Sequence, residues 1–181
     1  AAGLGQRHVR QLVNTHWHWD HTGSNEALAK AGATILAHEN TRLWLSDDVI
    51  SKWEGRTYPA RPARAQPTQT FFYDADAKPL SFGGQTLEYS LMPGAHSDGD
   101  IYVFFPRQNV LVAGDVVSGG EYPIVDYCTG GWLGGMIGGL KAMLKKGDAN
   151  TRFVPGRGGL RTRADLEAQM AIANLRKRGL Y

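Results

Sequence analysis

The sequence has little of what would assign a chain to a specialised class of protein. Cys128 is the only cysteine among 181 residues, so no disulfide can form within the chain, and cysteine content indicates no compartment. No apolar run approaches the roughly 18 residues that a membrane-spanning helix needs. The net charge is only +3, and the two basic stretches, 56–64 and 161–178, carry no nucleic-acid-binding motif. We therefore expect neither a membrane span nor a nucleic-acid partner.

The composition is that of an ordinary folded domain. Hydrophobic residues make up 42% of the chain and aromatic residues 10%, which is enough apolar side chain for one buried core and argues against disorder. The length suits one domain and no internal repeat is present, so we predict a single domain over residues 1–181. No signal peptide is visible, because the first ten residues are too short and too polar for one.

Three of the six histidines and an aspartate fall within six residues. They follow an alternating pattern over 9–13 that predicts a strand, which Asn14 ends. If residues 15–18 stay extended, the first two histidines point to the same side, and the other two residues follow as the chain turns into a helix. Nitrogen and oxygen ligands that converge at the end of a strand suit zinc, whereas solvated loop imidazoles are the alternative. The four candidate ligands are His16, His18, Asp20 and His21.

Two tryptophans alternate with these histidines. Trp17 and Trp19 should therefore point away from the metal, either into the core or into the wall of a pocket, and we keep Trp17 as a candidate for the substrate pocket. His38 has no second ligand at a useful spacing, so we expect it near a helix cap or on the surface and leave it outside the site.

Periodicity predicts helices that alternate with short strands. A long irregular loop over 54–69 carries several prolines and arginines; it could be a binding lid or a passive insertion, and its arginines could attract an anion or remain solvated. Gly83-Gly84 between two strands predicts a hairpin. The predicted helices cover 24–31, a segment from 38 to 45, 132–146 and 163–178, the last capped by Thr162 and Asp165, and the predicted strands cover 33–37, 70–73, 80–82, 86–91, 101–105, 110–113 and 152–154.

His-x-His-x-Asp-His after a hydrophobic strand resembles the signature of the metallo-β-lactamase superfamily. The segment 93–100 resembles the one that carries that family's third histidine ligand, here His96. The segment 112–115 resembles the one with the aspartate that bridges two metals, here Asp115. The segment 154–158 resembles the family's last motif, but the family has histidine where this chain has Arg157, and no histidine follows His96.

The resemblance implies an α/β (α+β) fold, an αβ/βα four-layer sandwich of two mixed β-sheets with metals at one edge. The first motif comes at residue 16, so the family's N-terminal strands are apparently missing, through truncation or processing, and a signal peptide could have been lost with them. A periplasmic or secreted location would fit the resemblance. The sheet edge that missing strands would expose would suit a homo-oligomer or a partner chain that completes the sheet.

The resemblance also implies a ligand set. His16, His18 and His96 would bind one zinc ion and leave a position open for water, so that a metal-bound hydroxide is available at neutral pH. A second ion would take Asp20, His21 and Asp115, or Asp20 would instead act as the catalytic residue that orients the water and accepts its proton. Arg157 has no lone pair for a metal. The second site would then be weakly occupied, or Arg157 would substitute by pairing with Asp20 or Asp115, or the residue is not the natural one.

We therefore expect a zinc-dependent hydrolase of a small molecule. The neighbourhood of His96 and of Tyr122 and Asp126 resembles bacterial hydrolases with β-lactamase activity, which favours a cyclic amide or ester such as a β-lactam, with Tyr122 and Asp126 as pocket candidates. A lactone or a thioester, as in glyoxalase II-like enzymes, is the alternative. A catalytically impaired relative that binds a ligand or a partner is the alternative of another class, because Arg157 departs from the family pattern.

Overall fold

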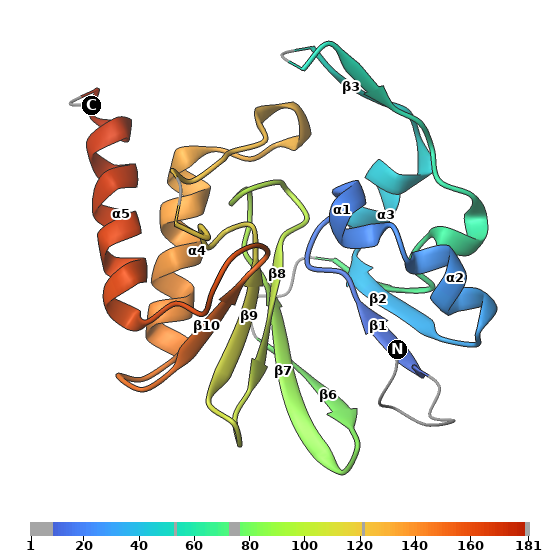
Figure 1. Cartoon of the computed structure of the whole chain (residues 1–181), viewed down its shortest axis with the longest axis horizontal. Helices are drawn as coiled ribbons and strands as arrows, with labels where there is room; N and C mark the ends of the chain where they lie inside the picture. Colours follow the sequence, from blue (N-terminus) through green and yellow to red (C-terminus); the bar gives the residue numbers. More distant parts are fainter. Residues whose placement is uncertain (1–8, 53, 73–76, 121, 180–181) are drawn as a thin grey trace. The chain divides into compact units, whose positions relative to one another are not determined.

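A computed structural model describes residues 9–52, 54–72, 77–120 and 122–179 of the chain (Figure 1). It divides the chain into two compact units, Ala1–Phe72 and Tyr73–Tyr181, which are described in turn. The expectation of a single domain stays a prediction. Among the described residues, no helix combines the length and the apolar character that crossing a membrane requires.

The first unit contains a small parallel sheet with the central strand almost fully buried. The strand order is β1-β2-β5, and both pairs are parallel, with Gln11 opposite Thr34 and Leu36 opposite Gln69. Burial on both faces suits the apolar centre of β2. The elements are β1 (Gln11–Val13), α1 (Trp19–Thr22), α2 (Asn25–Lys30), β2 (Thr34–His38), α3 (Glu39–Ser46) and β5 (Gln69–Phe71). Residue 73, the end of the predicted strand 70–73, lies outside the described residues.

The predicted irregular loop over 54–69 is wrong in part. β3 (Val49–Ser51) and β4 (Arg56–Tyr58) form an antiparallel ribbon, and a 3₁₀ turn follows at Ala63–Ala65. The prolines that indicated a loop lie after β4, where they leave the ribbon's backbone pairing intact. The turn is fastened to α2, because the Asn25 side chain donates to the carbonyl of Ala65 at 2.9 Å.

The second unit is built on a five-stranded mixed sheet in the order β10-β9-β8-β7-β6. β10 and β9 are parallel and the other neighbours are antiparallel. The predicted hairpin at Gly83-Gly84 is confirmed, because Phe82 pairs with Gln85 across it. The strands are β6 (Lys78–Phe82), β7 (Gln85–Leu91), β8 (Ile101–Phe105), β9 (Val110–Gly114) and β10 (Arg152–Pro155).

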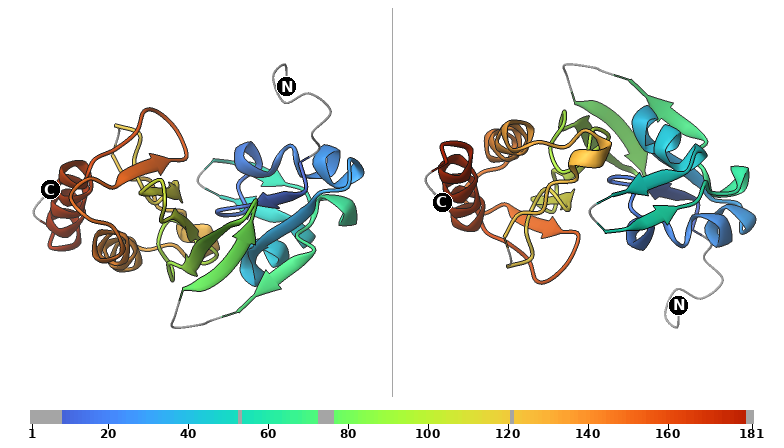
Figure 2. Two further views of the ribbon diagram at one scale, coloured as in Figure 1. Left: turned by 90° about the horizontal axis from the view of Figure 1, so that it is seen from below. Right: turned by 90° about the horizontal axis from the view of Figure 1, so that it is seen from above.

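Two long helices cover one face of this sheet. α4 (Leu133–Lys146) and α5 (Arg163–Lys177) run side by side in both views of Figure 2. The cap predicted for α5 is confirmed as a capping box, in which Thr162 and Asp165 bond each other's backbone N–H groups. The core between helices and sheet includes Met136, Leu140 and Met143 from α4, Leu166 from α5, and Tyr102, Leu111, Ala113 and Phe153 from the strands.

Candidate metal centre

In the first unit, hydrogen bonds fix the residue from which the histidine-rich loop starts. Asn14, directly after β1, and Asn25, at the start of α2, exchange side-chain amide hydrogen bonds of 3.0 and 2.9 Å, and both side chains are buried. The Asn14 backbone N–H also donates to the carbonyl of Leu36 at 2.9 Å. Sequence reasoning treated Asn14 only as the residue that ends the strand. The structure shows that it also sets where the loop leaves the sheet.

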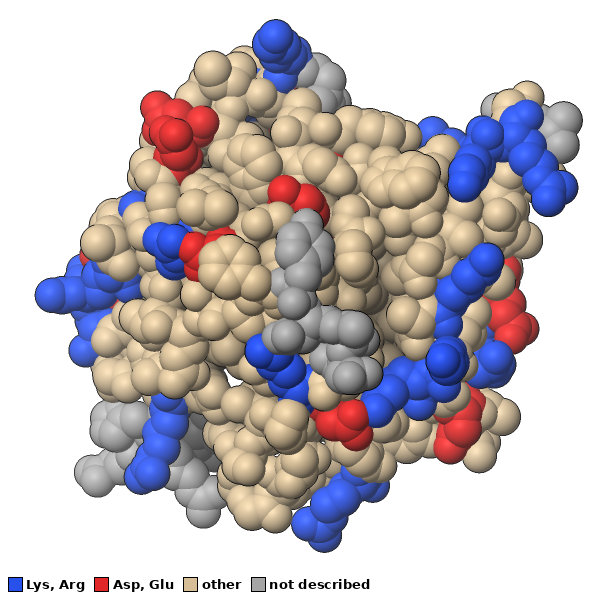
Figure 3. Space-filling view, turned by 180° about the vertical axis from the view of Figure 1, so that it is seen from behind, with Lys and Arg blue, Asp and Glu red and all other residues tan. Residues whose placement is uncertain are grey.

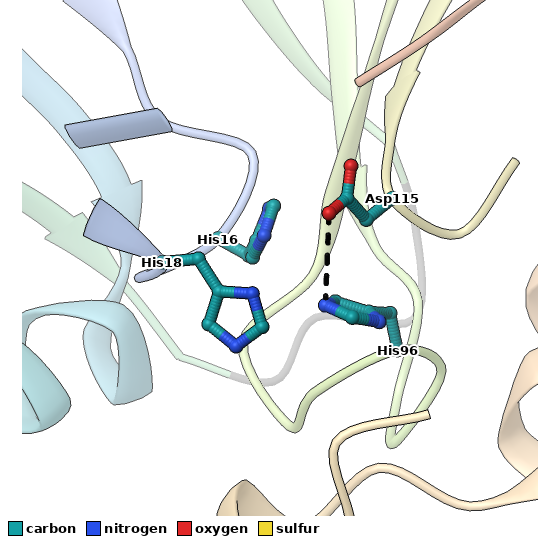
Figure 4. Close-up of side chains that lie close together, drawn as sticks. All are labelled: His16, His18, His96 and Asp115. Carbon is teal, nitrogen blue, oxygen red and sulfur yellow. Dashed lines mark ion pairs between the residues drawn. The ribbon is translucent and has the colours of Figure 1, made fainter. Parts of the chain in front are cut away.

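The three histidines of this loop gather at one place. The rings of His16 and His18 lie with centroids 4.8 Å apart, and the rings of His16 and His21 with centroids 4.4 Å apart. His16 is fully buried, with Nδ1 3.2 Å from the hydroxyl of Thr15. Figure 4 shows the imidazoles of His16 and His18 projecting from one short segment. The sequence-based expectation that these two side chains share a side therefore holds within the first unit.

The short helix α1 carries the other two candidate ligands of the motif. The Asp20 carboxylate lies 3.4 Å from Nε2 of His21, and the Asp20 side chain is half exposed. The Thr22 hydroxyl is 3.1 Å from each of the carbonyls of Trp17 and His18, so it ties the end of α1 back to the loop. Asp20 is thus positioned next to a histidine but remains open to solvent.

Trp17 supports the loop from behind. It is only 3% exposed and packs with Leu45 and Val49 in an apolar cluster, and its ring meets the ring of His18 edge-on at 4.6 Å. This is the core position that alternation along the loop favoured. We assign Trp17 this supporting role in place of direct substrate contact.

In the second unit, His96 sits in a loop between β7 and β8 that a buried carboxylate holds together. Asp100 is 1% exposed and accepts hydrogen bonds from the Ser97 backbone N–H at 2.5 Å and the Ser97 hydroxyl at 3.2 Å. Burial raises the pKa of the Asp100 carboxyl well above its usual value, although the bonds from Ser97 oppose the shift. The loop is closed by the Met92 N–H, which donates to the carbonyl of Asp100 at 2.7 Å. Sequence reasoning missed Asp100; its place at the start of β8 was the available signal.

The orientation of the His96 ring follows from one hydrogen bond. Nδ1 lies 2.8 Å from the carbonyl oxygen of Ile124, and a carbonyl can only accept, so Nδ1 carries the proton. The neutral ring then has its lone pair on Nε2, which lies 4.0 Å from Oδ2 of Asp115, as the dashed line in Figure 4 shows. His96 is 1% exposed. A backbone carbonyl that fixes the tautomer of a buried histidine is a common feature of metal ligands.

Asp115 and Arg157 are brought together by the two parallel strands of the sheet. β9 and β10 pair in parallel up to Gly114 opposite Pro155, and the Gly156 N–H donates to the carbonyl of Gly114 at 2.9 Å. The residues that follow each strand therefore leave the same edge of the sheet. Nη2 of Arg157 lies 3.9 Å from Oδ2 of Asp115. The structure thus places Arg157 beside one of the two partners that were predicted for it.

A cavity of about 300 Å³ opens beside this pair. Tyr122 lines it, as expected of a pocket candidate. Asp126 is not among the residues that line this cavity. It is 8% exposed, and its carboxylate accepts from the Cys128 N–H at 3.0 Å and the Thr129 hydroxyl at 2.5 Å, so it caps a 3₁₀ turn at Tyr127–Thr129. Its assignment to a substrate pocket stays a prediction. The cavity is lined by Asp115, Val117, Ser118, Gly119, Tyr122, Ile124, Arg157 and Gly158.

The donor atoms of each half fit a divalent metal of borderline softness. The first unit offers imidazole nitrogens, and the second offers Nε2 of His96 and a carboxylate oxygen of Asp115, which are the ligand types of zinc. Arg157 does not fit as a ligand, because guanidinium stays charged and has no lone pair. Imidazole and carboxylate are ligands of several divalent transition metals, zinc among them.

On the face seen in Figure 3, charged side chains form small groups. The face seen in Figure 3 is mostly uncharged, with lysine and arginine side chains in separate groups and acidic side chains between them. The expectation that the chain has no nucleic-acid partner remains a prediction from the sequence.

Comparison with known proteins adds a family and a fold. A family model described as "Metallo-beta-lactamase superfamily" matches residues 1–175. A hydroxyacylglutathione hydrolase from Thermosynechococcus vestitus is 31% identical over 112 residues, which cover 62% of this chain and 36% of that protein. The 2,4-dinitroanisole O-demethylase subunit alpha of a Nocardioides species is 28% identical over 127 residues, or 69% of this chain and 35% of that protein. The matched region thus spans about a third of the length of these curated relatives.

Solved structures share the fold. A metallo-β-lactamase from Pontibacter korlensis superposes with a TM-score of 0.71 at 21% identity, covering 92% of this chain and 69% of that one. The B3 metallo-β-lactamase BLEG-1 superposes with a TM-score of 0.73 at 22% identity, covering 93% and 78%. At such identities the likeness shows the fold alone. It confirms the predicted fold class.

Proposed function

The chain belongs to the metallo-β-lactamase superfamily, and from that premise we propose that it is a metal-dependent hydrolase. We propose that three imidazoles, those of His16 and His18 in the first unit and of His96 in the second, bind one divalent ion next to Asp115, and zinc is the leading candidate. Three imidazoles with an open position for water correspond to the catalytic class of zinc site, not to the closed structural class.

The observation that carries this proposal is the orientation of His96. The Ile124 carbonyl at 2.8 Å holds the ring with its metal-binding nitrogen directed toward Asp115. A solvated histidine has no fixed ring orientation. A histidine that ligates a metal is held by a hydrogen bond from its other ring nitrogen, and His96 has such a bond. The clustering of three further imidazoles in the first unit supports the same interpretation.

The chain's own residues would share the work of hydrolysis. When bound, the metal would act as a Lewis acid. It would lower the pKa of a coordinated water, so that hydroxide is available at neutral pH. We assign to Asp20, which is half exposed and next to His21, the role of accepting a proton from the attacking water. The cavity beside Asp115 would hold the acyl substrate, with Tyr122 against it.

Two acyl substrates remain in competition, and each has one supporting observation. The cyclic amide or ester, such as a β-lactam, is supported by the segment around His96 and Tyr122, which resembles bacterial hydrolases with β-lactamase activity. A thioester is supported by the 31% identity to a hydroxyacylglutathione hydrolase. The relatives are distant and longer, so the choice belongs to experiment.

The test measures turnover of both substrate classes by the full chain. Purified protein is assayed on a chromogenic cephalosporin and on a glutathione thioester whose released thiol is titrated, before and after a chelator and after zinc is returned. We expect turnover of one class, loss with the chelator and recovery with zinc. His96→Ala should abolish that turnover, and His38→Asn, which removes a histidine outside the site, should retain it. Turnover that is insensitive to the chelator would overturn the proposal, and no turnover of either class would favour a binding role.

A further inference from the structure

Arg157 lies beside Asp115, at a position where a two-metal centre would need a metal ligand. It follows β10 on the edge of the sheet where Asp115 follows β9, and its Nη2 lies 3.9 Å from Oδ2 of Asp115. A second ion held by Asp115 would need a further ligand at this position, and guanidinium cannot be one because it has no lone pair. The positive charge of Arg157 is also permanent, so it repels a second cation at every pH of interest.

The backbone of Arg157 is held firmly in this position. A Cβ added to Gly119 would lie 2.2 Å from the carbonyl oxygen of Arg157, so the two loops touch through their main chains. Gly158 has φ of +84°, and a Cβ there would lie 2.7 Å from the Gly119 carbonyl oxygen. Such a contact requires glycine on both sides. It fixes the point from which the Arg157 side chain starts, next to Asp115.

A carboxylate and a guanidinium lie beside each other at the cavity. Among the described residues that line the cavity, Asp115 is the acidic one and Arg157 the basic one. Asp115 is 14% exposed, so its charge is poorly solvated, and the guanidinium beside it compensates it. Arg161 adds further positive charge behind the cavity wall, because its Nε donates to the carbonyl of Ser118 at 3.2 Å.

The second unit also lacks nitrogen donors for another ion. His96 is the only histidine after residue 38, and its Nδ1 already donates to Ile124. Asp20 and His21 of the first unit would be the remaining ligands, which is too few to close a zinc coordination sphere without Asp115 and a further donor.

We infer that the guanidinium of Arg157 replaces a second metal ion: it pairs with Asp115, and the chain binds a single divalent ion. This inference rests on the proposed function. Arg157 thereby provides a fixed positive charge at the cavity that no chelator removes.

The experiment counts bound metal and does not depend on activity. Metal-free full-length chain is titrated with zinc by calorimetry, dialysed and analysed by elemental mass spectrometry, for the wild type, Arg157→His and Arg157→Lys. Arg152→His is the matched control, because it adds a histidine to the strand that precedes Arg157, at the exposed end away from Asp115. We expect about one ion per chain for the wild type, Arg157→Lys and Arg152→His, and about two for Arg157→His.

Each outcome decides the matter. About two ions on the wild type, or about one on a folded Arg157→His, would overturn the inference but leave the proposed function standing. No ion on the wild type would defeat both. Titration of the wild type with cobalt(II), followed by its visible absorption, covers the case in which Arg157→His fails to fold: a single saturating step supports the inference, and a second spectral transition contradicts it.

Discussion

The two units deliver metal-ligating side chains in different ways. In the first, three imidazoles come from six consecutive residues and rest on an aromatic cluster around Trp17. In the second, one imidazole and one carboxylate come from separate loops, and hydrogen bonds and a glycine contact between main chains set their positions. The ligands of the first unit are therefore supported by buried apolar side chains. Those of the second unit are supported by hydrogen bonds and by contact between main chains.

This difference has a consequence for tolerance to change. Apolar packing is lost in proportion to the volume removed, and other side chains can partly refill the space. Two backbones in contact have no such freedom, so a single methyl group forces them apart. Substitutions of Trp17 and of Gly119 test the two kinds of support separately.

The largest effect is expected in the first unit. Trp17→Ala removes a buried indole and should lower the free energy of unfolding by about 3–5 kcal/mol, because a large cavity remains beneath the histidine loop. Denaturant unfolding followed by circular dichroism measures it. Trp17→Phe should lose clearly less, since it refills part of the space. An alanine variant as stable as the wild type would show that packing does not support this half.

A smaller effect is expected in the second unit. Gly119→Ala places a Cβ 2.2 Å from the Arg157 carbonyl oxygen and should cost about 1–3 kcal/mol through forced separation of the two loops. Gly159→Ala is the control, because a Cβ there meets nothing within 4 Å, and its melting temperature should stay close to that of the wild type. Equal melting temperatures for the two variants would refute the role of the contact.

The smallest effect concerns a buried histidine that the proposal leaves outside the metal centre. His38 caps α3 by accepting from the Asn40 N–H at 3.2 Å, and burial lowers its pKa below the usual 6.5. The unfolded chain then binds the proton more readily, so this contribution to stability is complete above pH 6.5 and is lost as the pH falls toward the folded pKa. His38→Asn keeps a capping acceptor but cannot titrate, and its unfolding free energy should fall less between pH 7.5 and pH 5.5. If the unfolding free energy fell equally with pH in both proteins, protonation of His38 would not contribute to the loss of stability.

Much of the secondary structure could be predicted from local patterns. The hairpin at Gly83-Gly84, the capping box of α5 and the cap position of His38 depend on neighbouring residues, and all three are confirmed. The predicted loop over 54–69 was wrong in part, because the β3–β4 ribbon joins segments on either side of its boundary. A pattern of prolines and glycines does not reveal such a pairing.

Some site residues could be predicted from local spacing, and others could not. The clustering of His16, His18 and His21 is a short-range property, which their spacing along the chain already implies. The turn that Asp126 caps depends on residues two and three positions further along, which the sequence-based assignment of Asp126 to a pocket did not consider. Asp100 was missed because its role depends on burial, which sequence spacing does not report.

The sequence by itself determined the family signature, most of the helices and strands, and the identity of the candidate ligands, because these depend on residue type and on separations of a few positions. Only the tertiary structure decided that Arg157 lies beside Asp115 and that His96 bonds the Ile124 carbonyl. Both contacts depend on which strands and loops are neighbours in the folded sheet, and the parallel pairing of β9 with β10 joins segments that a helix separates along the chain.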